Sequence, residues 1–439
     1  MSQGDLHTAA VTPPTAISAS KPNSPARVPV ASLVGTTIEF YDFYIYATAA
    51  VIIFPRLFFP AADPASARLQ SFATFALAFF ARPIGSALFG HFGDRIGRKA
   101  TLVAALLTMG LSTILIGVLP TYARIGIVAP VLLAALRFGQ GLGLGGEWGG
   151  AVLLATEHAP RGKQALYGMY PQLGAPLGFI FSSATFLLLT TLLNDTELFA
   201  WGWRIPFLAS ALLVFLGLYV RLRLAETPAF QRAVANNERV RVPMLAVWRD
   251  YPGTILVGTL AATTTFLSFY LMTVFSLSWG TTALGYPRTE FLLLQMAAVL
   301  MFALFIPVSA LLADRYGRLE MLAVAAFALL LFGLVFAPLF SSGSPLRVLV
   351  YLSLGMALIG LTYGPLGTGL AELFRTSVRY TGASLTFNLA GILGASITPY
   401  VATALAKQYG LPYVGYYLSA ASLMSLVALI AIRLRHRTD

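Results

Sequence analysis

The chain has 439 residues, of which 57% are hydrophobic and only 10% are charged. A soluble globular domain carries about 25% charged residues, so most of this chain cannot face water. The formal net charge of +12 would suit a nucleic-acid partner, but the basic residues are spread over the connections between long apolar runs, which excludes that partner.

Residues 1–28 are rich in Pro, Ser, Thr and Ala and lack the apolar core of a cleaved signal peptide. We expect them to form a disordered cytoplasmic tail. The first apolar run then acts as an uncleaved signal anchor. The chain has no cysteine, which rules out disulfides and thiolate metal sites.

Apolar runs of about 20 residues recur along the chain, and each can cross a hydrocarbon core about 30 Å thick. Lipid offers no hydrogen-bond partners, and barrel strands would be shorter and alternate in polarity, so the runs must be helices. The sequence predicts an all-α membrane protein with twelve transmembrane helices. They cover residues 29–54, 68–92, 101–119, 126–155, 164–190, 203–221, 253–280, 289–313, 319–340, 346–372, 379–406 and 412–433.

The connections between these spans define two halves and an orientation. A polar stretch at 222–252 separates an N-terminal six-helix bundle (29–221) from a C-terminal one (253–433), and a short tail follows at 434–439. Lys and Arg gather on alternate connections, including both ends of the chain. This positive-inside pattern places both termini and the 222–252 linker in the cytoplasm.

Glu39 and Asp42 are the first ionisable residues inside a predicted span. Because they are three apart, they share one face of a helix, which Tyr46 extends by another turn. Repulsion between the carboxylates and their burial both favour protonation of one of them. The pair is our candidate proton-coupling site. The alternative is a permanently ionised pair that Arg82 or Arg137 neutralises in a structural network.

The second and fourth spans also contain charges. A charge in the bilayer centre costs at least about 2.5 kcal/mol, so each is a functional hypothesis. Arg82, followed by Pro83, offers a planar fork to a carboxylate, either that of a substrate or that of Asp42. Arg137 is assigned to coupling or structure. Glu147, in a glycine-rich stretch that lets helices approach closely, is a second proton-pathway candidate.

Later spans supply further candidates. Arg204 lies at the outer end of the sixth span beside two Trp residues, which fits either an anchor at the lipid headgroups or a role in substrate access. In the seventh and eleventh spans, polar and aromatic residues such as Tyr270 and Asn388 either line a cavity or make contacts between helices.

The two halves repeat a short motif after their second spans. Asp94-Arg95-Ile-Gly97-Arg98 corresponds to Asp314-Arg315-Tyr-Gly317-Arg318, which indicates duplication, as in transporters built from parallel six-span repeats. An aspartate here can accept hydrogen bonds from the N-terminus of a neighbouring helix, whose dipole favours an anion. The arginines can pair with acidic residues at other helix ends. Such links would hold the cytoplasmic side shut.

These stretches resemble known sequences. Residues 90–99 are similar to the signature loop of the major facilitator superfamily, and residues 137–141 to its second motif. Residues 35–43, 82–85, 145–150, 201–207 and 372–382 resemble the metabolite:proton symporter branch, whose members carry oxoglutarate and other di- or tricarboxylates, shikimate, and proline or betaine. Their order and spacing resemble the shikimate-type carriers most.

The resemblance implies a major facilitator fold in a bacterial inner membrane, with a monomer that carries a small-molecule substrate together with protons by alternating access. It also implies that the loop containing Asp94 acts as a conformational latch. Together with the residue-by-residue reasoning above, this assigns the following roles. Proton coupling falls to Glu39, Asp42, Arg137 and Glu147; substrate binding to Tyr41, Tyr46, Arg82, Arg204, Tyr270 and Asn388; and a conformational latch to Asp94, Arg95, Gly97, Arg98, Asp314, Arg315 and Arg318.

Buried arginines near carboxylates favour import of a small organic acid, such as shikimate or oxoglutarate. A zwitterion symporter of the proline or betaine type is an alternative, as is an uncoupled facilitator or an exporter. The four His residues form no zinc motif, and neither a Walker loop nor a Gly-x-Ser-x-Gly elbow occurs. We therefore expect no enzyme activity, no cofactor, no metal site and no nucleic-acid partner.

Overall fold

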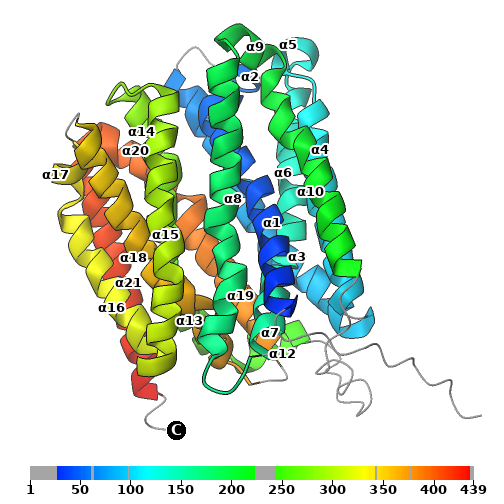
Figure 1. The fold of residues 1–439 in the computed structure, drawn as a ribbon, viewed down its shortest axis with the longest axis vertical. Helices are drawn as coiled ribbons and strands as arrows, with labels where there is room; N and C mark the ends of the chain where they lie inside the picture. The colour runs from blue at the N-terminus through cyan, green and yellow to red at the C-terminus, as the bar shows by residue number, and fades with distance from the viewer. Residues whose placement is uncertain are drawn as a thin grey trace, which may run out of the picture.

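The computed structural model describes residues 27–60, 64–96, 98–157, 159–222, 243–341, 344–375 and 378–435. These residues form long helices that run side by side, and none of them is in a β-strand. The start of α1 and the end of α21 lie at one end of the molecule, the lower end in Figure 1, which we call the terminal end. The short helices α2, α5 and α9 lie at the opposite end.

The first half of the chain contributes the helices that lie to the right in Figure 1. They are α1 (Arg27–Ile52), α2 (Phe54–Leu57), α3 (Pro64–Ile96), α4 (Arg98–Val118), α5 (Tyr122–Ile125), α6 (Val128–Gly145), α7 (Trp148–Glu157), α8 (Gln164–Leu192), α9 (Asp195–Ala200), a 3₁₀ turn η1 (Gly202–Arg204) and α10 (Ile205–Leu222). Within this half, α1 packs on α8, α3 on α6, and α4 on both α6 and α10.

The second half contributes α12 (Pro243–Asp250), α13 (Pro252–Tyr270), η2 (Leu271–Phe275), α14 (Ser276–Thr282), α15 (Arg288–Tyr316), α16 (Arg318–Leu334), α17 (Phe336–Phe340), α18 (Pro345–Glu372), α19 (Arg379–Gly391), η3 (Ile392–Ser396), α20 (Thr398–Tyr409) and α21 (Leu411–Arg435). Here α15 packs on α18, and α21 packs on α13 and α16. The halves meet mainly where α8 contacts α15 and α18, and where α3 contacts α19.

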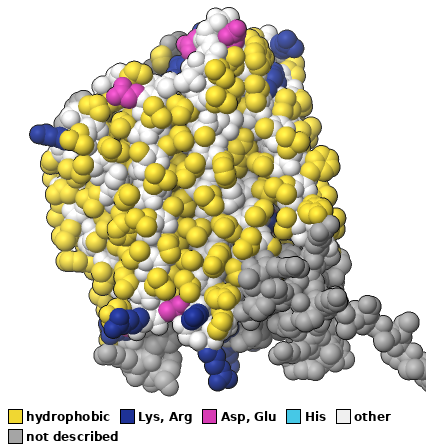
Figure 2. Space-filling view, viewed as in Figure 1, with side chains coloured by type: hydrophobic (Ala, Val, Ile, Leu, Met, Phe, Trp, Pro, Cys, Tyr) yellow, Lys and Arg dark blue, Asp and Glu magenta, His cyan; other side chains and the backbone are white. Residues whose placement is uncertain are grey.

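The twelve predicted spans are confirmed. Ten described segments are long and apolar enough to cross a membrane, and α1, of 26 residues, and α16, of 17 residues, complete the set. Hydrophobic side chains cover the middle of the face shown in Figure 2, while most of its charged side chains lie toward the two ends. This distribution is what a lipid-facing surface requires.

Several predicted spans are interrupted. The span at 126–155 consists of α6 and α7, which are separated at Gly146 and Glu147. The spans at 253–280 and 379–406 contain the π-helical segments η2 and η3. Such segments widen the helix locally and often occur at functional sites. Of the predicted 222–252 linker, residues 223–242 lie outside the described residues, and α12 follows them.

The glycines of α6 allow a close approach to α3. A Cβ atom at Gly141 would collide with the carbonyl oxygen of Ala78, and one at Gly145 would collide with that of Arg82. The glycine-rich stretch therefore serves helix packing, as its position inside a span predicts. This packing brings the break at Gly146–Glu147 next to the centre of the molecule, where the candidate site lies.

Candidate functional site

A small central cavity lies between the two halves. Its volume is about 30 Å³, which is room for a water or two and not for an organic substrate. Side chains from both halves line it: Glu39, Phe40, Tyr44, Arg82, Leu144, Trp148 and Ala175 from the first, and Thr265, Phe266, Phe269, Tyr270, Phe302, Ile359, Tyr363, Phe387 and Asn388 from the second. The wall is therefore largely aromatic, with one acidic and one basic residue.

Six charged side chains are buried among the described residues, and all six belong to the first half. They are Glu39, Asp42, Arg82, Arg137, Glu147 and Arg221. The three acids and three arginines would balance if all were ionised. Five of the six are residues that the sequence singles out, and Arg221 is the addition.

Arg82 is the basic residue of the cavity wall. Its guanidinium carbon lies 4.5 Å from the ring centre of Phe43 and 4.4 Å from that of Phe79, so two aromatic faces fix its position. No carboxylate of the described residues forms an ion pair with Arg82, and the Nε of Arg82 has no hydrogen-bond partner. A planar cation without a direct ion pair among the described residues thus faces the space between the halves.

Asp42 and Glu39 both lie on α1 but face different groups. Its two carboxylate oxygens accept no hydrogen bond of good geometry, and the hydroxyls of Ser210 and Thr113 face them. A carboxylate in this position lacks the charge partner that a buried anion needs. The predicted pairing of Glu39 with Asp42 thus becomes two separate environments on one helix.

Arg137 forms a polar connection on the same side of the molecule. Its guanidinium stacks on the rings of Phe43 and Tyr46, at 4.2 and 4.0 Å from their centres. Its Nη1 donates to Gln140 Oε1 at 2.9 Å, and Gln140 Nε2 donates to the Thr113 hydroxyl at 2.7 Å. This chain of contacts links Arg137 to the hydroxyl that faces Asp42.

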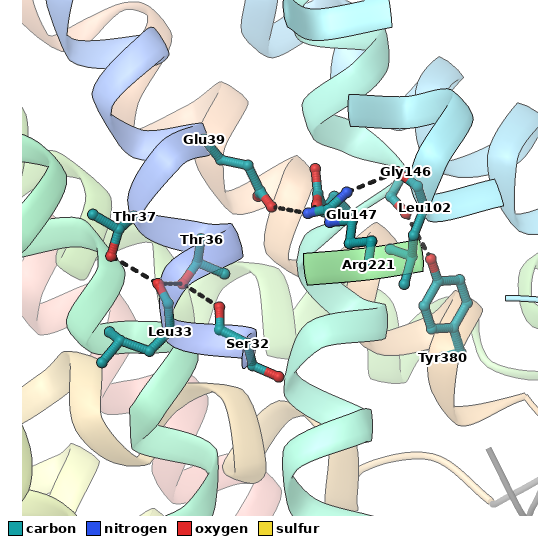
Figure 3. Close-up of polar contacts among 10 residues, drawn as sticks. All are labelled: Ser32, Leu33, Thr36, Thr37, Glu39, Leu102, Gly146, Glu147, Arg221 and Tyr380. Atoms are coloured by element: carbon teal, nitrogen blue, oxygen red, sulfur yellow. Dashed lines mark hydrogen bonds and ion pairs between the residues drawn. The ribbon is translucent and has the colours of Figure 1, made fainter. Parts of the chain in front are cut away.

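Glu39, Arg221 and Glu147 form a buried ion triad (Figure 3). Arg221 Nη2 lies 2.9 Å from Glu39 Oε1 and also contacts Glu147 Oε1. Arg221 Nη1 donates to the carbonyl oxygen of Leu102 at 2.7 Å. Arg221 is the last residue of the predicted span at 203–221, where a basic residue fits the positive-inside pattern of the cytoplasmic ends. The structure instead shows it as the buried cation that two acids share.

Of the other predicted substrate residues, some line the cavity and others lie outside its wall. Tyr270 and Asn388 line the cavity, and Asn388 Nδ2 donates to Ser86 Oγ of the first half at 2.7 Å. Tyr41 donates to the carbonyl oxygen of Pro206 at 3.3 Å, outside the cavity wall. Tyr46 is the ring on which Arg137 stacks. These placements bring two of the predicted residues to the cavity and leave two beside it.

Arg204 does not belong to the cavity wall. Its Nη1 donates to the carbonyl oxygens of Gly117 and Leu119, at 2.7 and 2.9 Å. It thus supplies hydrogen bonds to carbonyl groups at the end of α4. Its guanidinium also lies 4.5 Å from the ring centre of Trp203. The role in substrate access stays a prediction, and we do not include Arg204 in the site.

Contacts between the halves close the terminal end. Asp314 accepts hydrogen bonds from the backbone N–H groups of Ala165 and Leu166, both at 3.0 Å. These groups belong to the first turn of α8, where the helix dipole favours an anion. Arg318 Nη2 reaches Gln164 at 3.4 Å and pairs with Glu372 within its own half.

Two further contacts join the halves between this end and the cavity. Tyr380 donates to the carbonyl oxygen of Gly146 at 2.9 Å, and the rings of Trp148 and Phe387 stack with centres 3.5 Å apart. Of the other latch candidates, Arg315 stacks on its neighbour Tyr316. The side chains of Asp94, Arg95 and Arg98, together with Gly97, lie outside the described residues.

The opposite end contains a wide vestibule of about 790 Å³. Arg56, Arg68 and Arg288 line it together with one acid, Asp195, so that its charge is mainly positive. Arg288 Nη1 lies 3.2 Å from Asp195 Oδ1, and this exposed pair links the two halves. The structure is therefore open toward the vestibule and closed at the terminal end.

Comparison with known sequences identifies relatives over most of the chain. The family described as "Sugar (and other) transporter" matches residues 28–243 and 248–434. The chain is 56% identical over 421 residues to the inner membrane metabolite transport protein YhjE of Escherichia coli K12, with 95% of each chain covered. It is 35% identical to the shikimate transporter of the same organism, with 93% of this chain and 94% of that protein covered.

A more distant relative is the proline/betaine transporter of Salmonella typhimurium LT2, at 31% identity over 92% of this chain and 82% of that protein. Among solved structures, the proton:xylose symporter XylE of the major facilitator superfamily, bound to 6-bromo-6-deoxy-D-glucose, superposes with a TM-score of 0.71 at 15% identity. The match covers 92% of this chain and 94% of that chain, and at this identity it shows a common fold.

Proposed function

Because the chain belongs to the sugar (and other) transporter family of the major facilitator superfamily, we propose that it imports a small organic anion together with protons across a bacterial inner membrane. The family makes it a metabolite transporter and not an enzyme. The charge of the central cavity supports the choice of an anion, the unpaired Asp42 supports the proton, and the state of the two ends supports the direction.

The Arg82 guanidinium in the cavity wall carries the proposal, because it forms no direct ion pair with a carboxylate of the described residues. Glu39 is the acidic residue of that wall, and its carboxylate is already paired with Arg221. A carboxylate that enters the cavity can form a bidentate pair with Arg82, while the aromatic residues around it can cover the apolar face of a small ring. The cavity must expand first, because about 30 Å³ cannot hold such a compound.

Asp42 supplies the proton-carrying group of the proposal. An isolated carboxylate in a lipid-shielded interior is stable only when it is protonated or gains a cation. The described structure offers it hydroxyl groups and no cation of its own. Asp42 would therefore hold a proton in this state and release it in a state in which water or a cation reaches its carboxylate.

The proposed direction follows from the two ends. The positive-inside pattern of the sequence assigns the terminal end to the cytoplasm, so the vestibule would face the periplasm. Its three arginines would attract anions and raise their local concentration. In this orientation the structure corresponds to an outward-facing state with a closed centre, and the positive charge of the vestibule is what favours the loading of an anion from the periplasm.

A zwitterion of the betaine type is a second candidate, and the aromatic wall favours it. Trp148, Phe266, Phe269 and Phe387 could surround a quaternary ammonium group, as aromatic cages do, while Arg82 held the carboxylate. A relative named for proline and betaine belongs to the same set of proteins. The two candidates differ in whether the substrate carries net charge at neutral pH.

Uptake into proteoliposomes tests the proposal. The panel contains labelled shikimate, oxoglutarate, citrate, proline and betaine, with an inward proton gradient that is either kept or collapsed by an uncoupler. We expect one of the anions to accumulate only while the gradient exists. Accumulation of betaine or proline alone would select the second candidate, and uptake that merely equilibrates, with or without the gradient, would refute proton coupling.

Asp42→Asn provides the residue-level test, with Glu320→Gln as the control, because Glu320 is an exposed acid outside the cavity and the vestibule that pairs with Arg433 within its own half. The Asp42 variant should lose gradient-driven accumulation and keep the exchange of labelled for unlabelled substrate, because exchange needs no net proton movement. The control should retain both. If Asp42→Asn still accumulated substrate against a gradient, another group would have to carry the proton.

A further inference from the structure

We propose that Glu39, Arg221 and Glu147 form a second proton site, separate from Asp42, which binds a proton when an anionic substrate pairs with Arg82. This inference rests on the proposed function and adds to it a stoichiometry of two protons per anion. It also assigns a role to Arg221.

The geometry of the triad is that of two acids sharing one cation. The same nitrogen of Arg221, Nη2, contacts both carboxylates, while Nη1 is occupied by the Leu102 carbonyl oxygen. Neither acid therefore has the two-pronged pair that stabilises a buried carboxylate best. Glu39 and Glu147 are almost completely buried, at 2% and 0% exposure, so water cannot screen the excess negative charge.

Arg82 is the cation that offsets this excess while the cavity is empty. Glu39 belongs both to the triad and to the cavity wall that contains Arg82, and Arg82 acts electrostatically on Glu39. With both acids ionised, the triad carries one net negative charge and Arg82 one positive charge. These four residues are then neutral together, which a low-dielectric interior favours strongly.

An anion that pairs with Arg82 upsets this balance. Arg82 is neutralised by the substrate, and the triad keeps one uncompensated negative charge in the interior. A proton that moves from the vestibule side onto a carboxylate oxygen of Glu39 or Glu147 restores neutrality. No other bond changes: one O–H bond forms, and the other carboxylate keeps Arg221. Substrate binding and proton binding thus favour each other, as reciprocal linkage requires.

The other ionisable groups that the described residues place near the triad carry no positive charge. Tyr44 and Tyr270 line the cavity with Glu39, and Tyr380 donates to the carbonyl oxygen of Gly146, next to Glu147. Besides Arg82 from α3, the described groups that act on Glu39 or are acted on by it are Asp42, further along α1, and the Tyr363 hydroxyl from α18. Asp42 is an acid without a partner and Tyr363 carries no charge at neutral pH. Neither can replace Arg82 as the compensating cation.

The position of Glu147 connects the triad to the closed end. It lies at the break between α6 and α7, between Gly146, whose carbonyl oxygen accepts from Tyr380, and Trp148, which stacks on Phe387. Figure 3 shows Tyr380 near Gly146, next to Glu147 of the triad. Opening the terminal end must break both contacts, which would displace Glu147 relative to Arg221 and release the proton on that side.

The proton-to-substrate ratio of the wild type tests the proposal. In proteoliposomes with the membrane potential clamped at zero, the substrate gradient that just stops net flux is measured at a difference of one pH unit. The probe is the panel anion that the wild type accumulates. One proton balances about a tenfold gradient and two protons about a hundredfold gradient. We expect about a hundredfold gradient for the wild type, and a tenfold gradient would overturn the second site.

Glu147→Gln and Glu39→Gln each leave a balanced pair of one acid with Arg221. We expect either variant to balance only about a tenfold gradient at one pH unit, and an unchanged hundredfold gradient would overturn the proposal. The wild-type measurement keeps the proposal falsifiable even if a variant does not fold. A wild type in which the pH difference drives no gradient at all would refute the proposed function itself, so the two failures are distinguishable.

Discussion

Asp314→Asn removes the charge by which the second half holds the first turn of α8. Two carboxylate oxygens accept the N–H groups of Ala165 and Leu166, both at 3.0 Å. Asparagine has the same shape, but its NH₂ group would face one of these two donors, and it has no charge for the helix dipole to favour. A hydrogen bond to a charged group contributes about 1.5–3 kcal/mol. We expect the free energy of the closed state to rise by about 1.5–2 kcal/mol relative to the open state. The fraction of molecules in the open state then increases about 10- to 30-fold.

Cysteine labelling measures this change, because the chain has no cysteine of its own. Thr368→Cys places a thiol on α18 against Gly168 of α8, at a position that is 4% exposed. When labelling is slow compared with opening, the rate of maleimide reaction follows the open fraction. Asp314→Asn should therefore increase this rate about 10- to 30-fold.

Glu320→Gln is the control for this experiment. Glu320 lies in the first turn of α16, next in the chain to the motif that contains Asp314, and pairs with Arg433 at 3.6 Å within its own half. Its loss should leave the labelling rate unchanged within about twofold, because an exposed pair contributes little. If the Asp314 variant labels no faster than this control, the contact with α8 does not hold the terminal end closed.

Three further predictions concern the cavity, the vestibule and the packing of α6. Arg82→Lys keeps the charge and loses the planar fork, so kcat/KM for uptake of the anion should fall about 10- to 100-fold. Arg82→Gln should show no uptake. Wild-type rates in these variants would contradict a contact between Arg82 and the substrate. Arg288→Gln should raise the apparent KM about two- to fivefold at low salt and not in 0.5 M salt, because screening removes vestibule attraction. Gly141→Leu should lower the unfolding temperature in detergent by at least about 5 °C, whereas Gly150→Ala, which meets only ordinary contacts, should not.

The spans could be predicted from sequence because membrane insertion depends on length and apolarity, which are local properties. The interruptions could not. Residues 271–275 and 392–396 contain neither a proline nor a run of polar residues, so the apolar run continues through them. Their π-helical geometry depends on neighbours such as α13, α20 and α3 that pack against them.

The ionisable residues of the site could be predicted one by one, but not their partners. Glu39 and Asp42 share a helix face by spacing, yet one reaches a guanidinium and the other only hydroxyls. Arg221 lies 182 residues from Glu39 in the chain, and no local pattern connects them. Its place at the end of a span also made it look like a topology signal, whereas its side chain turns back into the protein.

The location of the buried charges has an evolutionary consequence. All six belong to the first half, while the second half contributes to the cavity only neutral side chains from α13, α15, α18 and α19. Substitutions on those helices can change the shape and polarity of the cavity wall without creating or removing an ion partner. Substitutions in the second half alone could therefore change which metabolite fits, while the ion partners of the first half stay as they are.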